Sequence, residues 1–284
     1  RSGVNQTIGY LTMYVGPSYS ADVDTGSGTL TLTGNVNLRA FQGSSDASPA
    51  ATIRGRLHLG AYSSGSYGIL SHNFDVYETA LQGPAIDLDV SAIISGGPDV
   101  TLAKTSGGGL RLSGANTYQG DTFLNGGIVE IANDQAFGDG KVSMRDTYLR
   151  SDDDARTVDN ELSIDSTMYF VGTQDLTFTG RTVLTAGRSL MVFDPQQTVT
   201  FAGEVADDVW APADLTKWGR GTIAFTAANT LSGTIYVTRD GGTMVLSGEG
   251  SFLNARQYEA QTGAALVLDN SGTNRSNRLN DQIE

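Results

Sequence analysis

The chain has 284 residues and a formal net charge of −13, with an isoelectric point near 4.4. This acidity opposes binding to nucleic-acid phosphates and to anionic membrane surfaces, so we expect no nucleic-acid partner. Cysteine is absent, which excludes disulfides, thiol nucleophiles and thiolate metal sites. Glycine is abundant, at 36 residues, and proline is scarce, at 6, which predicts a β-rich fold with glycine turns.

Short runs that alternate apolar with polar or small residues recur along the chain, and most of them meet a glycine. This pattern is typical of half-buried strands that end in turns. In chain order the most regular runs lie at 8–14, 28–34, 86–90, 176–180 and 199–203. No segment approaches the roughly 20 apolar residues that a membrane-spanning helix needs, so we expect no transmembrane segment.

Self-comparison reveals a repeat at long spacing, which is how solenoids are recognised in a sequence. The segment 102–120 aligns without a gap with 215–233, and a shorter copy lies at 28–34. The residues that fall in register include Lys104 with Lys217, Asn116 with Asn229, and Gly120 with Gly233.

The first copy, together with 125–131, resembles the passenger-associated, or autotransporter-associated β-strand, repeat. The resemblance is clearest near 100–144 and 214–274. It implies an all-β, right-handed parallel β-helix (β-solenoid) and export to the bacterial cell surface. We therefore expect a single solenoid domain with glycine-rich turns over 1–284. The region 38–79 has no recognisable repeat and is a candidate protruding loop region.

Alternate apolar residues of each strand should face a common interior. The residues predicted to point inward are Leu30, Leu32, Leu110, Leu112, Val129, Ile131, Phe178, Phe201, Ile223, Phe225, Met244 and Leu246. We expect Asn116 and Asn229 to hydrogen-bond nearby backbone at corners, where asparagine tolerates left-handed geometry. For Lys104 and Lys217 we expect stems that cover apolar surface while the ammonium groups stay in water.

Residues suited to catalysis or metal binding are few. The histidines are His58 and His72 alone, and neither a convincing nucleophile motif nor a zinc-ligand spacing accompanies them. Clustered carboxylates could serve a polysaccharide-cleaving solenoid or bind calcium. Asp87 and Asp89 lie two apart on one expected strand and share a face, whereas Asp152, Asp153 and Asp154, and Asp207 and Asp208, are adjacent. We interpret the adjacent ones as solvated turns, and predict no catalytic, metal or cofactor site.

Aromatic residues are the remaining candidates for contact with a partner. The glycine- and serine-rich segment with Tyr62, Tyr67 and Gly68 is the predicted partner-contact loop. Other aromatic side chains that could stack on sugars are Tyr77, Tyr118, Tyr169, Trp210 and Trp218.

These observations favour a non-enzymatic extracellular scaffold, a rod that forms or joins a cell-surface fibre, filament, layer or adhesin. Neither terminus resembles a cap, and 274–284 reads as a polar turn, so we expect self-association through head-to-tail stacking or further repeats of a longer solenoid. The first residue, Arg1, indicates a processed or excised chain. The alternatives are a passenger adhesin that binds host or glycan ligands and, third, a polysaccharide-cleaving enzyme.

Overall fold

The protein is an all-β parallel β-solenoid of about 10 turns, as the sequence predicts. The structure, a computed structural model, describes residues 3–16, 18–40, 49–61, 70–78, 86–239 and 242–281. The chain divides into two compact units, Arg1–Val142 and Ser143–Glu284. The predicted single domain and the right-handed winding stay predictions.

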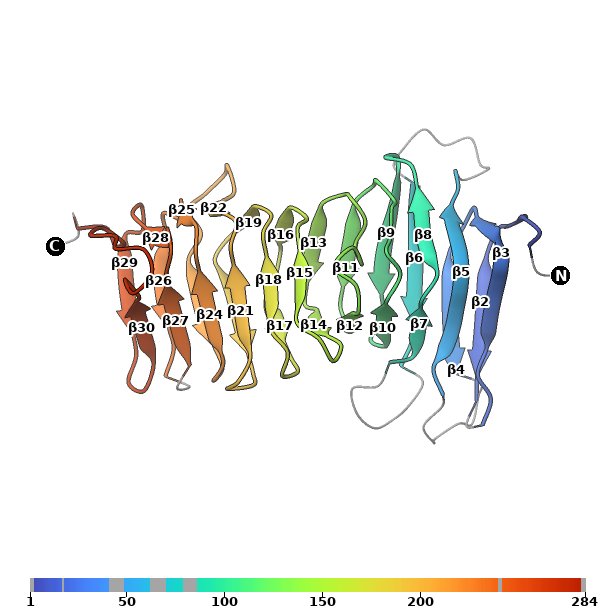
Figure 1. Ribbon diagram of the computed structural model, residues 1–284, viewed down its shortest axis with the longest axis horizontal. Helices are drawn as coiled ribbons and strands as arrows, with labels where there is room; N and C mark the ends of the chain where they lie inside the picture. Colours follow the sequence, from blue (N-terminus) through green and yellow to red (C-terminus); the bar gives the residue numbers. More distant parts are fainter. Residues whose placement is uncertain are drawn as a thin grey trace. The chain divides into compact units, whose positions relative to one another are not determined.

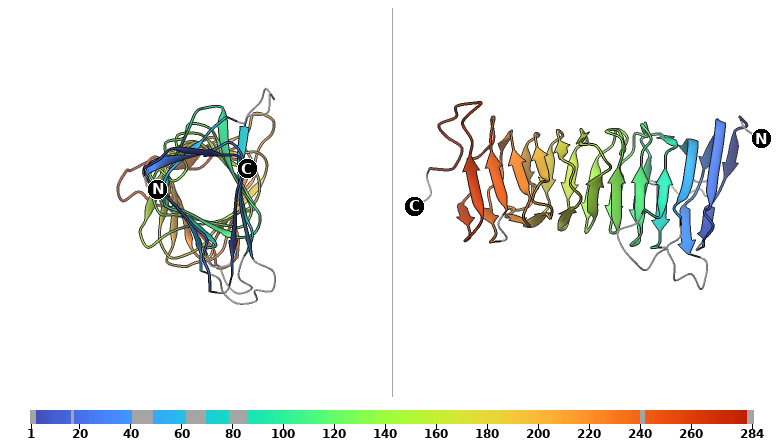
Figure 2. Two further views of the ribbon diagram at one scale, coloured as in Figure 1. Left: turned by 90° about the vertical axis from the view of Figure 1, so that its right-hand side faces the viewer. Right: turned by 60° about the horizontal axis from the view of Figure 1, so that its bottom comes forward.

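The N-terminal unit contains two parallel ladders (Figure 1). The first ladder runs β1 (Gln6–Ile8), β3 (Asp22–Leu32), β5 (Ala51–Leu59), β7 (Leu88–Val90), β10 (Gly109–Leu112) and β12 (Ile128–Ile131), with β8 (Ile93–Gly96) also paired to β5. The second ladder runs β2 (Leu11–Val15), β4 (Val36–Ala40), β6 (Leu70–Val76), β9 (Val100–Thr105) and β11 (Thr122–Asn125). Figure 2 shows these blue and green strands on different sides of a common interior.

The C-terminal unit contains three longer ladders and a short one, and β13 (Val142–Arg145) lies at the division. One ladder runs β14 (Tyr148–Ser151), β17 (Met168–Phe170), β20 (Arg188–Val192), β23 (Leu215–Trp218), β26 (Thr234–Val237) and β29 (Gln257–Ala260). A second runs β15 (Arg156–Val158), β18 (Leu176–Phe178), β21 (Thr198–Phe201), β24 (Thr222–Phe225), β27 (Thr243–Leu246) and β30 (Ala265–Leu268). The others are β16 (Leu162–Ile164), β19 (Thr182–Leu184) and β22 (Val205–Asp207), and the pair β25 (Ala228–Asn229) and β28 (Ser251–Phe252).

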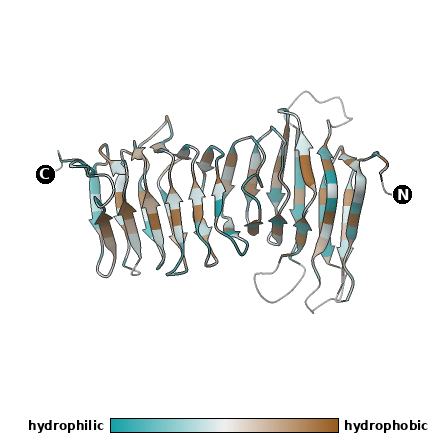
Figure 3. Cartoon of the chain, viewed as in Figure 1, coloured by the Kyte–Doolittle hydropathy of each residue, from teal (hydrophilic) through white to brown (hydrophobic). Residues whose placement is uncertain are grey.

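Alternation along each strand produces the interior, and apolar and polar residues follow one another along the strands in Figure 3. Every residue predicted to point inward is buried. In the C-terminal unit the phenylalanines of successive coils stack. The ring centroids of Phe178 and Phe201 lie 5.4 Å apart, and those of Phe201 and Phe225 lie 5.5 Å apart. Each coil therefore covers the apolar side chains of its neighbour, which is what stabilises a fold without disulfides.

The region 38–79 differs from the expectation of a protruding loop. Its described residues include β5 and β6, which pair in register with the strands of neighbouring coils. Self-comparison finds no copy of the repeat within 51–59, so only strand alternation there could have predicted β5.

Candidate functional site

The recurrent asparagines of the repeat are buried ties between coils. The Asn116 amide oxygen accepts a hydrogen bond from the Ile94 N–H at 2.8 Å, and its Nδ2 donates to the Ala136 carbonyl at 2.7 Å. Ile94 belongs to the preceding coil and Ala136 to the following one, so one side chain joins three levels of the solenoid.

Asn229 repeats this arrangement in the second copy. Its amide oxygen accepts from the Val205 N–H at 2.8 Å, and Nδ2 donates to the carbonyls of Ala227 and Ser251. The prediction of backbone hydrogen bonding is confirmed. Neither asparagine is among the described residues with positive φ, so the left-handed geometry that asparagine tolerates is not used here. Each asparagine side chain reaches backbone groups of neighbouring coils. The sequence analysis expected bonds to nearby backbone at a corner and did not include these contacts between coils.

We expect Asn116→Ala to lower the free energy of unfolding by about 3 kcal/mol, because the Ile94 N–H and the Ala136 carbonyl both lose a buried partner. Denaturant unfolding of the purified chain measures the change. Asn125→Ala is the matched control, since Asn125 is exposed in the same repeat and its loss should cost little. Equal effects of the two substitutions would show that the tie contributes no stability.

The recurrent lysines correct another expectation, since their ammonium groups do not stay in water. Lys104 is fully buried, and its Nζ donates to the carbonyls of Thr105 at 3.2 Å, Ser106 at 2.5 Å and Gly126 at 3.2 Å. Burial lowers the pKa of Lys104 to about 8, against the opposing effect of the Asp87 and Asp75 carboxylates. The carbonyls of a turn covered by the next coil need donors, and the lysine supplies them.

Lys217 is likewise buried, and its Nζ donates to the Gly219 carbonyl. The buried lysines also account for two glycines of the repeat. A Cβ at Gly127 would press on the Lys104 ammonium, and a Cβ at Gly242 would press on that of Lys217. Glycine at these positions therefore leaves room for the buried ammonium groups.

One difference between the two copies falls where the first copy has room for a side chain. Arg220 stands where the first copy has Gly107, and a Cβ at Gly107 would meet nothing within 4 Å. Ser106 and Gly219 occupy equivalent positions with φ of 69° and 77°, a region that favours glycine. The Ser106 hydroxyl donates to Asp75 at 2.5 Å, which ties this unusual residue to the preceding coil.

The carboxylates of the predicted clusters bind different partners within the fold. Asp87 is buried and accepts a hydrogen bond from the Gly109 N–H at 2.7 Å, whereas Asp89 is partly exposed. Arg156 binds Asp152 with two hydrogen bonds of 2.9 Å and contacts Asp154 at 3.3 Å. These bonds hold turns and neighbouring coils together, and nothing in them provides an acid and a base facing one substrate.

The histidines also lie apart. His72 is buried, and its ring nitrogens lie 2.9 Å from the Gly34 carbonyl and 3.0 Å from the Gly60 carbonyl. His58 Nδ1 lies 3.1 Å from the Ser95 hydroxyl, which also points to the Leu57 carbonyl at 3.4 Å. Within the described ranges, no group of three or more His, Asp or Glu side chains could hold a metal ion.

The predicted partner-contact loop, with Tyr62, Tyr67 and Gly68, lies outside the described residues. The other aromatic candidates have different environments. Tyr118 is fully buried, with its hydroxyl 2.6 Å from that of Thr122. The Arg39 guanidinium lies 3.7 Å from the centre of the Tyr77 ring.

The remaining aromatic candidates lie in the C-terminal unit. The ring of Tyr169 stacks on that of Tyr148 at 4.5 Å, so neighbouring rings cover part of each face. Trp218 is 38% exposed and Trp210 is 87% exposed. The sequence pattern does not separate the buried Tyr118 from the exposed Trp210, because both lie in loops outside the alternating strand runs.

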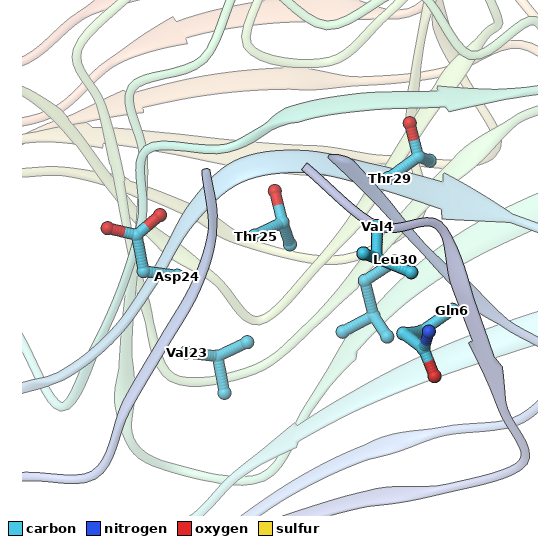
Figure 4. A pocket seen from close by; sticks show the side chains of 7 residues that line it. All are labelled: Val4, Gln6, Val23, Asp24, Thr25, Thr29 and Leu30. Carbon is cyan, nitrogen blue, oxygen red and sulfur yellow. The ribbon is translucent and has the colours of Figure 1, made fainter. Parts of the chain in front are cut away.

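A small pocket lies between β1 and β3 in the N-terminal unit (Figure 4). It is lined by Val4, Gln6, Val23, Asp24, Thr25, Thr29 and Leu30. Figure 4 shows Asp24 and Gln6 on opposite sides, with Val23 and Leu30 between them. Asp24 is the sole ionisable side chain of this lining, so the pocket lacks the paired groups of general acid–base catalysis.

The candidate functional surface is the outer edge of β29 and β30 in the C-terminal unit. Leu268 pairs in register with Leu246 of the preceding coil, and both belong to the inward-facing row. Leu246 is fully buried, whereas Leu268 is 46% exposed because no described strand covers it. The edge thus combines an apolar row with one unpaired side of a parallel ladder, which is a template for another coil.

The described segment after β30 is mostly polar and consists mainly of bends, turns and irregular backbone, as expected, and it also makes contacts that the sequence did not predict. Leu279 forms a parallel bridge with Phe252, so it continues the β28 position one coil further. The buried Arg278 guanidinium donates to the carbonyls of Gly248 and Gly250, and to those of Asp269 and Thr273. These residues cover the β28 edge and leave the β30 edge accessible.

Comparison with known proteins identifies the repeat. The model of the passenger-associated-transport-repeat family matches residues 23–43, 102–131 and 215–246. The second and third matches coincide with the two copies found by self-comparison, and the first includes the short copy at 28–34, so the predicted resemblance is confirmed. No curated protein and no solved structure matches the chain. In the part of the chain that the structure describes, no helix is long and apolar enough to cross a membrane.

Proposed function

Since the chain is a parallel β-solenoid that carries passenger-associated-transport repeats, we propose that it is a non-enzymatic scaffold of the cell surface that extends by end-to-end stacking of coils. Repeats of this kind imply secretion to the cell surface. The proposal makes the chain a structural element of a fibre, filament or layer.

The observation that carries the proposal is the uncovered apolar row at β30. The chain pairs coil after coil in parallel register, and at Leu268 the same row is half exposed. Val267, on the other face of β30, is 40% exposed. A further coil would cover the inward row and complete the backbone hydrogen bonds of the ladder, as each coil does for its neighbour.

The polar groups support a structural role. The buried lysines, asparagines and Asp87 bind backbone groups of their own or adjacent coils. These polar side chains, which are of types that also occur in catalytic sites, here stabilise the contacts within and between coils.

We expect sedimentation velocity to show association that grows with protein concentration and is weakened by Leu268→Lys, because the substitution places a charge on the apolar edge. Ile93→Lys is the control, since Ile93 is 43% exposed on β8, within the N-terminal unit. Circular dichroism of both variants checks that the fold is retained. A wild-type chain that stays monomeric at the highest concentration would refute end-to-end stacking of copies.

A further inference from the structure

The most exposed large apolar side chains among the described residues lie together on one loop. Val209 and Trp210 are each 87% exposed, and Ala211 and Pro212, which follow them, are exposed as well. The loop connects β22 to β23, and Figure 1 shows it projecting beyond the strands. Four consecutive exposed apolar residues on a projecting loop form a contiguous apolar patch. Such patches mark sites of contact with a membrane, a protein or a ligand.

The loop is an addition to one coil. Along the ladder of β17, β20, β23 and β26, Met168 pairs with Leu190, Leu190 with Lys217, and Lys217 with Val237. From Leu190 to Lys217 the chain needs 27 residues to complete one coil, whereas the coil before it takes 22 residues and the coil after it takes 20. The coil does not need the extra residues to close, because the shorter coils on both sides pair in the same ladder.

The base of the loop is fixed, so the apolar tip is held outward. The Asp207 carboxylate accepts hydrogen bonds from the Ala213 N–H at 2.9 Å and, in the next coil, from the Ser232 N–H at 2.9 Å and hydroxyl at 2.5 Å. Ala213 is fully buried, and Asp208 accepts a further bond from the Val209 N–H at 2.7 Å. A tip anchored in this way loses little conformational entropy when it binds.

We propose that the loop tip, Val209 to Pro212, inserts into the interface of lipid bilayers with electrically neutral headgroups. Tryptophan favours this interface because its ring is apolar and its indole N–H reaches polar groups. Interfacial insertion reaches about 5–10 Å deep, a depth suited to a short projecting loop. The carboxylates at the base and the net charge of −13 oppose anionic lipids, which restricts the target to neutral headgroups.

Other ligand classes fit the tip less well. A stable protein interface buries about 800 Å² on each partner, more than four loop residues provide. Sugar sites place several polar groups around the ligand, whereas the four residues at this tip have apolar side chains apart from the indole N–H.

Tryptophan fluorescence tests the proposal directly, because Trp210 and Trp218 are the only two tryptophans. In a Trp218→Phe chain, Trp210 is the sole emitter. We expect phosphatidylcholine vesicles to shift its emission to shorter wavelength and brominated phosphatidylcholine to quench it. Added phosphatidylglycerol should weaken binding. In co-sedimentation of the otherwise wild-type chain, Trp210→Ser should lower vesicle binding about tenfold.

Tyr19→Ser is the matched control, because Tyr19 is 77% exposed and lies in the N-terminal unit, so vesicle binding should be unchanged. No emission change with phosphatidylcholine vesicles would overturn the proposal, as would equal binding of the Trp210→Ser chain. A response to the neutral polysaccharide dextran without a response to vesicles would assign the tip to sugars instead. None of these results depends on whether copies of the chain stack.

Discussion

Replacing Phe201 with alanine is expected to lower the free energy of unfolding by about 4 kcal/mol, the largest effect of a single truncation considered for this fold. Phe201 is 1% exposed, and its ring stacks between those of Phe178 and Phe225 in the coils on either side. The substitution removes apolar contacts in three coils at once and leaves a cavity that rigid ladders cannot readily close. Guanidinium unfolding followed by circular dichroism measures the loss.

Phe193→Ala is the matched control for this experiment. Phe193 is 43% exposed, and its ring lies 6.4 Å from that of Tyr169 on the outside of the C-terminal unit. Its removal should cost less than a third as much, because little apolar surface returns to water. If both truncations were equally mild, the interior phenylalanine stack would not be a main source of stability.

The stability of the protein is expected to rise as pH increases from about 8 to 10, because of Lys104. Its pKa is lowered from 10.5 to about 8 by burial, so the unfolded chain binds more protons in this interval than the folded chain. The free energy of unfolding then increases with pH, by up to about 3 kcal/mol over the full interval between the two pKa values. Above pH 10 the trend should reverse, because burial raises the pKa of Tyr118 and the unfolded tyrosine loses its proton first.

Comparison of the wild-type chain with Lys104→Met isolates the contribution of this lysine. The methionine variant should lose most of the rise between pH 8 and 10, whereas Lys141→Met should retain it, since Lys141 is partly exposed. Denaturant midpoints at closely spaced pH values provide the measurement. The same slope in the wild-type and Lys104→Met chains would mean that Lys104 is not desolvated in the native state.

The sequence predicted the parts of this fold that depend on alternation within a strand. Leu110, Leu112, Phe201 and Phe225 could be assigned to the interior because a period of two fixes which side chains share a face. The repeat then showed that such strands stack. The polar interior could not be assigned in the same way. Lys104 makes one of its three bonds to Gly126 in the next coil, and a single sequence does not state the register between coils.

The exposed surfaces illustrate the same limit. Trp210 and Tyr118 are both aromatic residues in loops, yet one is 87% exposed and the other is fully buried. Trp210 lies in the longest of the three coil steps compared above, and the length of a coil can be measured only once the ladder register is known. The recurrence of Asn116 and Asn229 was the available signal for the interior ties, and their recurrence did indicate a structural role.

The asparagine ties also affect the order in which the molecule can be completed. Asn116 needs the Ile94 amide from the coil before it and the Ala136 carbonyl from the coil after it. A chain that emerges from the N-terminus can therefore form the first of these bonds at once, but the second waits for 20 more residues. The newest coil at a growing end is always only partly bonded, and each added coil secures the one before it against reopening. The same holds for growth from either end, because each tie gains one bond from the coil before it and one from the coil after it.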